Sequence, residues 1–196
     1  MQDSDAATSA PPVDDLPVIE TARLRLRGHR QDDLNAYFQL HADPAVMRYW
    51  SWPAWTSVEQ AQDRLSQVIG QRGANRVLCW AIADQGDDRL LGSIVLFAIN
   101  REQGRAETGY ALSSSHWGRG LAQEAMAPVL RHAFDVLGLR RIEADIDPRN
   151  AGSCRLVERM GFVREGLLRE RWCVAGEVSD SAMYGLLAAD WRVRAR

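Results

Sequence analysis

The sequence predicts an α+β fold in one domain, and three observations support this prediction. The chain has 196 residues, 46% hydrophobic and 26% charged, which is ordinary for a single globular domain. Three apolar, strand-like segments follow one another on short turns, which favours an antiparallel meander. Helical and strand-like segments then alternate, so the full order is a strand, two helices and then βββαβαββ, with about seven strands.

The domain is expected to open with a strand and two helices. Residues 23–27 alternate arginine and leucine, a pattern typical of a strand with one buried face. Each helix is predicted by polar capping residues in front of apolar residues at helical spacing. The first helix runs from about Asp32 to the residue before Asp43, and the second from about Thr56 to Gly70 or Gly73.

Turn-forming residues delimit the remaining elements. Residues 84–88 and Gln103-Gly104 separate the strands of the meander, and Gly138 and Gly161 are typical of residues that end a helix. The predicted strands are 76–83, 90–99, 106–112, 140–147, 162–172 and 178–187, and the predicted helices are 120–137 and 151–160.

Both ends of the chain are expected to lie outside the domain. Residues 1–17 hold almost no large apolar side chain, so burial cannot offset the entropy lost on ordering. We therefore expect a flexible N-terminal tail at 1–17, a single domain at 18–188 and a C-terminal tail at 189–196.

The composition disfavours several classes of protein. All 24 basic residues are arginine, and without lysine neither Schiff-base chemistry nor a Walker-type phosphate loop is available. A net charge of −2 disfavours a nucleic-acid partner, and the lack of a long apolar segment disfavours a membrane-spanning helix. Three widely spaced cysteines and a start unlike a signal peptide favour a reducing cytoplasm, and the scattered histidines predict no metal site.

Residues 113–125 carry the first functional signal. They join a predicted strand to a predicted helix through Gly118 and Gly120, which let backbone N–H groups approach a ligand closely. Because a helix start offers unpaired N–H groups, the segment predicts a backbone cradle for phosphate or pyrophosphate, with Arg119 at its rim. A tight loop that uses glycine only for its geometry is the alternative, and the missing third glycine disfavours a dinucleotide fold.

A second segment, residues 147–162, strengthens this prediction. Asn150 stands at the start of a predicted helix, Ser153 lies one turn further along, and Gly161 closes the helix. Asn150 is expected to cap the helix, a role that is compatible with contacting a ligand.

Together these segments resemble the GNAT superfamily of acetyl-CoA-dependent N-acetyltransferases over about residues 18–188. Within it they are similar to the branch that acetylates the N-termini of ribosomal proteins, RimJ/RimL. The residues that carry the resemblance are Glu20–Arg27, Ala106–Tyr110, His116–Ala122, Asn150 with Ser153, and Glu158–Phe162.

The resemblance implies a mixed, mostly antiparallel sheet whose central strands splay apart to admit acetyl-CoA. The pyrophosphate would rest on the backbone of 118–122, and Trp117 stands where the superfamily usually has Gln or Arg. Leu112 and Ser113 would hold the pantetheine arm like an added strand, and Asn150 would face its far end. The implied cofactor-binding residues are Leu112, Ser113, Trp117, Gly118, Arg119, Gly120, Leu121, Ala122, Asn150 and Ser153.

The resemblance also implies a base for the amine. Glu107 matches the position where many members carry their base, although pairing with an arginine such as Arg105 is the alternative. A backbone N–H near Tyr110–Leu112 is expected to stabilise the oxyanion.

The acid that protonates the departing thiolate is a departure from the family pattern. Many members carry a tyrosine seven residues after the asparagine, where this chain has Val157. Ser153 is our substitute because a hydroxyl one turn into the helix could hydrogen-bond the sulfur, and Tyr184 is a weaker candidate.

The acceptor site is expected near a tryptophan-rich loop. Trp50, Trp52 and Trp55 lie between the first two helices and would wall the acceptor, unless the loop is buried against the core. Glu143, Asp145 and Asp147 alternate along one predicted strand and Asp180 lies in the final hairpin; they form either a solvated face or an acidic patch.

We therefore expect a cytoplasmic enzyme, monomeric or homodimeric and without a metal, that transfers the acetyl group of acetyl-CoA to a primary amine. The α-amine of a protein N-terminus is the favoured acceptor. The alternatives are a small-molecule amine or amino acid as acceptor, a non-catalytic CoA-binding regulatory module, and a nucleotide-binding protein. No nucleic-acid or membrane partner is expected.

Overall fold

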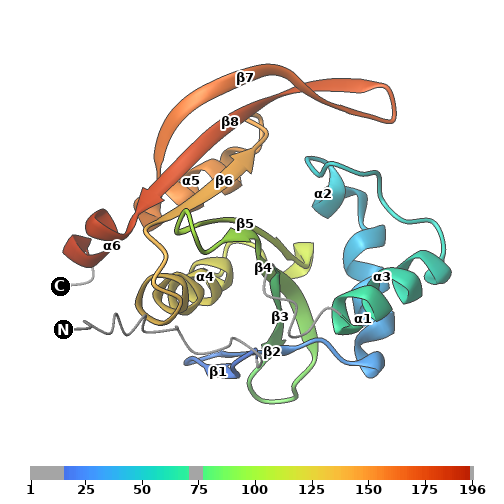
Figure 1. Ribbon diagram of the computed structural model, residues 1–196. Helices are drawn as coiled ribbons and strands as arrows, with labels where there is room; N and C mark the ends of the chain where they lie inside the picture. Colours follow the sequence, from blue (N-terminus) through green and yellow to red (C-terminus); the bar gives the residue numbers. More distant parts are fainter. Residues whose placement is uncertain (1–15, 71–76, 195–196) are drawn as a thin grey trace, which may run out of the picture.

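A single sheet of eight strands forms the centre of the protein. The computed structural model describes residues 16–70 and 77–194, and the strands follow the order β1-β2-β3-β4-β5-β6-β8-β7 (Figure 1). Neighbouring strands pair antiparallel except β5 and β6, which are parallel. This confirms the predicted α+β fold and adds the two-residue strand β1 to the seven expected strands. The strands are β1 Ile19–Glu20, β2 Leu24–Gly28, β3 Leu78–Asp84, β4 Leu90–Asn100, β5 Arg105–Leu112, β6 Arg141–Ile146, β7 Val163–Val174 and β8 Glu177–Leu187.

The parallel pair β5 and β6 is short. Arg105–Glu107 lies beside Arg141–Glu143, and beyond these residues both strands continue without pairing to each other. The two central strands therefore splay apart, as the resemblance implied, and β5 keeps one unpaired edge in the middle of the sheet (Figure 1).

Helices cover both faces of the sheet. In β3, Trp80 and Ile82 belong to the main core together with α4, α5 and α6, whereas Ala81 between them packs against α1 and α3. Within residues 16–70 and 77–194, no helix is both long and apolar enough to cross a membrane. The helices are α1 Leu34–Ala42, α2 Pro44–Met47, α3 Val58–Gly70, α4 Leu121–Arg131, α5 Ala151–Met160 and α6 Ala188–Arg194.

Three segments differ from the prediction. The short helix α2 was not expected; the carboxylate of Asp43 caps it by accepting the Ala45 N–H at 2.8 Å. The helix predicted at 120–137 is α-helical to Arg131, and residues 132–136 form a π-helical turn before Gly138. The expected C-terminal tail instead forms α6, because Trp191 packs into the main core.

Several expectations include residues outside the described ranges. The predicted strand 76–83 begins at Arg76 and the expected C-terminal tail ends with residues 195–196, none of which is described. Gly73, one of the two ends considered for the second helix, is not among the described residues, and the helix as described, α3, ends at Gly70. Most of the expected tail at 1–17 is not described either. Its last two residues are, and the Pro17 carbonyl accepts a hydrogen bond from the Trp80 indole at 2.9 Å.

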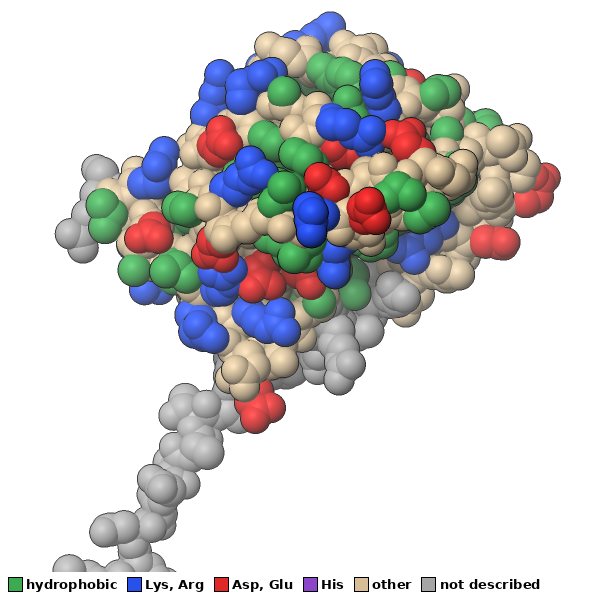
Figure 2. All heavy atoms as spheres, turned by 90° about the horizontal axis from the view of Figure 1, so that it is seen from above, with side chains coloured by type: hydrophobic (Ala, Val, Ile, Leu, Met, Phe, Trp, Pro, Cys, Tyr) green, Lys and Arg blue, Asp and Glu red, His purple; other side chains and the backbone are tan. Residues whose placement is uncertain are grey.

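Strands β7 and β8 form a long hairpin at the edge of the sheet. Strand β7 is exposed along almost its whole length, and the view from above the hairpin shows apolar, arginine and acidic side chains mixed together (Figure 2). Its pairing with β8 shifts between Leu168 and Trp172, and Glu170 has a φ of +53°. A bulge of this kind hinders pairing with a further strand and re-aims the neighbouring side chains.

Candidate active site

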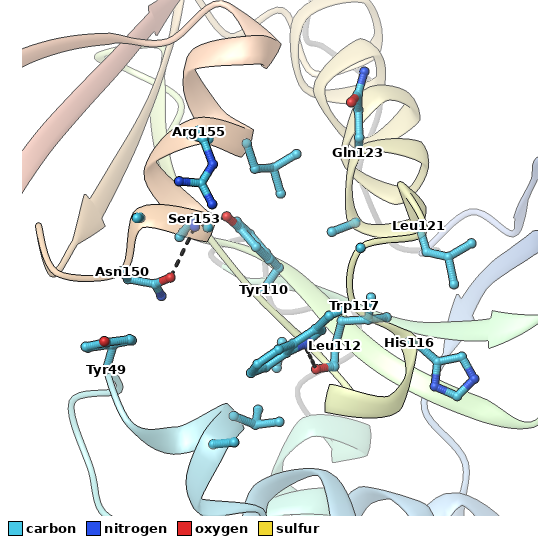
Figure 3. A pocket seen from close by; sticks show the side chains of 18 of the residues that line it. Tyr49, Tyr110, Leu112, His116, Trp117, Leu121, Gln123, Asn150, Ser153 and Arg155 are labelled. Atoms are coloured by element: carbon cyan, nitrogen blue, oxygen red, sulfur yellow. Dashed lines mark hydrogen bonds between the residues drawn. The ribbon is translucent and has the colours of Figure 1, made fainter.

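A cleft of about 810 Å³ opens where β5 and β6 separate. The end of β5, the loop before α4, the first turns of α4 and α5, and the segment around α2 form its walls (Figure 3). Two residues predicted to bind the cofactor, Ser113 and Arg119, are not among its lining residues. The predicted residues that do line it are Leu112, Trp117, Gly118, Gly120, Leu121, Ala122, Asn150 and Ser153.

The unpaired edge of β5 belongs to Tyr110 and Leu112. The Ser113 N–H donates to the Leu91 carbonyl at 2.8 Å, which makes these two residues a hydrogen-bonded pair of the β4–β5 ladder. Such pairs alternate along an antiparallel ladder, so the backbone groups of Tyr110 and Leu112 face away from β4. The Leu112 carbonyl accepts from Trp117 Nε1 at 2.7 Å. The Ser113 N–H is therefore bonded to β4, whereas the backbone groups of Tyr110 and Leu112 face the gap between β5 and β6.

Two left-handed glycines shape the loop before α4. Gly118 has a φ of +72° and Gly120 one of +76°, a region that favours glycine. A Cβ at Gly118 would meet no atom within 4 Å, and one at Gly120 would meet only Arg23, at 3.7 Å. Backbone conformation, not crowding by the protein, therefore requires glycine here, and the loop delivers the unpaired N–H groups of the α4 N-terminus to the cleft.

Tyr110 and Ser153 form a hydrogen-bonded pair inside the cleft. Their hydroxyl oxygens lie 2.6 Å apart, and Tyr110 comes from β5 while Ser153 comes from α5 (Figure 3). Burial raises the pKa of Tyr110 to about 12, although the hydrogen bond with Ser153 acts in the other direction. The phenol is therefore protonated at neutral pH. Sequence reasoning missed Tyr110 as a donor, and its aromatic hydroxyl on the splaying strand was the available signal.

The start of α5 agrees with the predicted cap. The two other positions considered for a hydroxyl acid, 157 and 184, contribute no hydroxyl to the cleft. Asn150 Oδ1 accepts the Ser153 N–H at 3.1 Å, which confirms Asn150 as the N-cap. Val157, at the position of the usual family tyrosine, is fully buried in the core. Tyr184 does not line the cleft, and its hydroxyl donates to Glu158 at 3.0 Å.

Arginines dominate the charged residues of the cleft. Among the described residues, its lining includes four arginines and no carboxylate. Arg149 is paired with Asp147 and Glu177 at 2.6 Å each, whereas no acidic partner of Arg155 or Arg159 is found in the described parts of the chain. Arg155 and Arg159 are four residues apart on α5, a spacing that puts both on one helix face and could have been read from the sequence. The arginines are Arg48, Arg149, Arg155 and Arg159.

Glu107 lies on β5 at the last residue that pairs with β6. Arg105, considered as its partner, instead donates to Glu143 at 3.2 Å, and the Glu107 side chain has no hydrogen-bond or ion-pair partner among residues 16–70 and 77–194. Burial, together with the nearby carboxylates of Glu143 and Asp145, raises the pKa of Glu107. Glu107 does not line the cleft but marks the point where the two strands separate.

The tryptophan-rich loop divides between the cleft and the core. Trp50 lines the cleft, and Trp52 packs edge-to-face on it with ring centroids 4.7 Å apart. Trp55 stacks on His41 at 4.4 Å and packs with Tyr37, away from the lining residues. Of the three tryptophans predicted to wall the acceptor, the cleft therefore receives only Trp50 directly.

Comparison with known proteins agrees with this architecture. A family model described as an acetyltransferase (GNAT) domain matches residues 23–163. The uncharacterized N-acetyltransferase p20 of Bacillus licheniformis is 32% identical over 176 residues, which cover 90% of this chain and 99% of that relative. The spermidine N(1)-acetyltransferase of Vibrio cholerae is 25% identical over 81% of this chain and 90% of its own. A solved GNAT-family acetyltransferase from Bacillus anthracis superposes with a TM-score of 0.76 at 26% identity, over 88% of this chain and 99% of that one.

The splayed sheet, the cleft beside the start of α4 and these matches define the chain as an N-acetyltransferase. It belongs to the GNAT superfamily. The protein is therefore an enzyme that uses acetyl-CoA as co-substrate and transfers its acetyl group to an amine.

Proposed function

We propose that acetyl-CoA binds along the cleft, with its pyrophosphate on the loop 118–122 and its pantetheine arm beside the unpaired edge of β5. Three features support this placement. Left-handed glycines lead into a helix start that favours an anion. The backbone N–H and carbonyl of Tyr110 turn away from β4 and can pair with an extended arm. Arg155 and Arg159 lack acidic partners in the described ranges and can pair with phosphate groups.

We propose Glu107 as the base and the Tyr110–Ser153 pair as the acid. Glu107 accepts the proton that the amine loses when its nitrogen attacks the acetyl carbonyl, and the raised pKa of Glu107 brings it closer to neutral pH. The N–H of Leu112 is placed to stabilise the oxyanion. As the carbon–sulfur bond breaks, the hydroxyl pair donates a proton to the departing thiolate and then regains one from solvent, while Glu107 releases the proton of the amine to solvent.

We infer that the acceptor is the α-amine of a peptide or protein N-terminus. One observation supports this inference: the carboxylates next to Glu107 are themselves paired with arginines. Glu143 pairs with Arg105 and with Arg141, which it shares with Glu165, and Asp145 lies 3.6 Å from Arg171. These arginines offset part of the negative charge that would select a polyamine, whereas an α-amine with a pKa near 8 is already roughly a tenth neutral at pH 7.

The resemblance to the RimJ/RimL branch supports the same acceptor. We propose that the enzyme acts in a reducing cytoplasm. The relative named as a spermidine acetyltransferase favours a small polyamine as the alternative. The two acceptors differ in charge and size, so an activity assay separates them.

The test measures kcat/KM with short peptides that carry a free small first residue, with spermidine and with free amino acids. We expect the peptides to be acetylated fastest, and their N-terminally blocked forms not at all. Trp50→Ala should raise the peptide KM, since Trp50 borders the cleft. A higher kcat/KM for spermidine or a free amino acid would remove the protein acceptor, and no turnover with any amine would favour a CoA-binding module.

A further inference from the structure

The corner between β1 and β2 is fastened to the first turn of α4 through one carboxylate. Glu124 accepts hydrogen bonds from the Thr21 hydroxyl at 2.7 Å, from the Arg23 N–H at 2.8 Å and from Arg23 Nε at 2.7 Å. Arg23 Nη2 lies 2.6 Å from the second oxygen of Glu124. Arg23 and Glu124 are 101 positions apart. This contact therefore joins the opening segment of the domain to the first turn of α4, which follows the loop proposed for the pyrophosphate.

Arg23 also reaches the loop itself. Its Nη1 donates to the carbonyl of Arg119 at 3.0 Å, and Arg119 stands between the two left-handed glycines, Gly118 and Gly120. The peptide between Arg119 and Gly120 is trans, since no cis peptide occurs in the described chain. The bond to Arg23 therefore turns the Arg119 carbonyl towards Arg23 and the Gly120 N–H in the opposite direction.

Stability alone does not account for this arrangement. The Arg23 side chain is 51% exposed, and ion pairs at such positions contribute little to folding. Charge gives a second reason, because Glu124 follows the start of α4 by one turn, where an uncompensated carboxylate would repel a bound phosphate. Burial alone would raise the pKa of Glu124, but hydrogen bonds from Thr21 and Arg23 lower it, so the group is charged and Arg23 neutralises it.

We propose that Arg23 is a positioning residue for acetyl-CoA: it holds the Arg119 carbonyl and balances Glu124, so that the loop 118–120 presents its N–H groups to the pyrophosphate. Arg23 acts through the loop and does not itself contact the ligand. This proposal rests on the proposed placement of the pyrophosphate at that loop.

The test compares two acetyl donors, acetyl-CoA and acetyl-pantetheine, of which only the first carries a pyrophosphate. For Arg23→Ala we expect the KM of acetyl-CoA to rise about tenfold, as for a lost charge-assisted hydrogen bond. The kcat and the kcat/KM with acetyl-pantetheine should stay unchanged. Arg25→Ala is the matched control, because Arg25 lies two residues further along, in β2, and forms a comparable ion pair with Glu20 at 2.7 Å.

Two further variants keep the outcome decisive. Arg23→Lys retains a cation for Glu124 but cannot hold the Arg119 carbonyl at the same time, so its acetyl-CoA KM should lie between those of wild type and Arg23→Ala. It replaces Arg23→Ala if that variant does not fold. Gly118→Val tests the loop directly, since valine is strained at a φ of +72°.

Equal losses with both donors, or no loss in a folded Arg23 variant, would overturn the role of Arg23. If Gly118→Val weakens acetyl-CoA binding while the Arg23 variants do not, only this inference fails. If Gly118→Val also leaves acetyl-CoA binding intact, the proposed pyrophosphate site itself is wrong.

Discussion

Glu107 combines a half-buried carboxyl with two acidic neighbours, and this surrounding has a consequence for the pH dependence of the reaction. Burial first, and then Glu143 and Asp145, raise its pKa above the ordinary value for glutamate, about 4.3. A base must be unprotonated, so kcat/KM should fall as pH drops through this raised pKa. This fall adds to the one caused by protonation of the amine, whose pKa is near 8.

We predict that Glu107→Gln lowers kcat by about a hundredfold at neutral pH, a typical loss for a general base. The part of the fall in kcat/KM at acidic pH that comes from protonation of Glu107 should disappear, while the affinity for acetyl-CoA stays the same. Glu102→Gln, in the exposed turn before β5, is the control and should behave as wild type. A pH–rate profile with full activity in Glu107→Gln would remove Glu107 as the base.

At the scale of elements, β5 and α5 each contribute one hydroxyl to the pair Tyr110–Ser153. If this pair protonates the thiolate, Tyr110→Phe should lower kcat about tenfold, and Ser153→Ala by less. The double variant should cost less than the two losses combined, because both hydroxyls serve one proton transfer. Tyr184→Phe is the control, since its hydroxyl faces Glu158. Additive losses in kcat would show that the two hydroxyls act separately.

The distance along the chain between contacting residues explains which features could be predicted from the sequence. Local patterns predicted most elements, because alternation in β2 and the Asn150 cap with Gly161 in α5 depend only on neighbouring residues. The Tyr110–Ser153 pair was missed because its members are 43 residues apart and meet only in the folded domain. Likewise, the pairing of Arg105 with Glu143 depends on β6 lying parallel to β5.

At the scale of the whole molecule, a buried ion pair connects β2, the start of α1 and the β3–β4 turn. Arg27 donates to both oxygens of Asp33 at 2.9 and 2.8 Å, and to Asp88 at 2.9 Å. The Arg27 and Asp33 side chains are only 3% and 5% exposed, so neither charge has water to replace its partner. Removing the Asp33 charge leaves the buried Arg27 with only the partly exposed Asp88 as an ion-pair partner among the described residues.

We therefore predict that Asp33→Asn lowers the free energy of unfolding by about 3 kcal/mol at pH 7. Burial alone would raise the pKa of Asp33, but hydrogen bonds from Arg27 and from the Arg30 N–H lower it. A lowered folded pKa gives stability that is complete above the unfolded value, about 3.9, and is lost as pH falls through the folded one. Urea unfolding should thus show the difference between wild type and Asp33→Asn shrinking at acidic pH. Asp32→Asn, the exposed neighbour, should have no such effect, and a difference independent of pH would contradict the ionic origin of this stability.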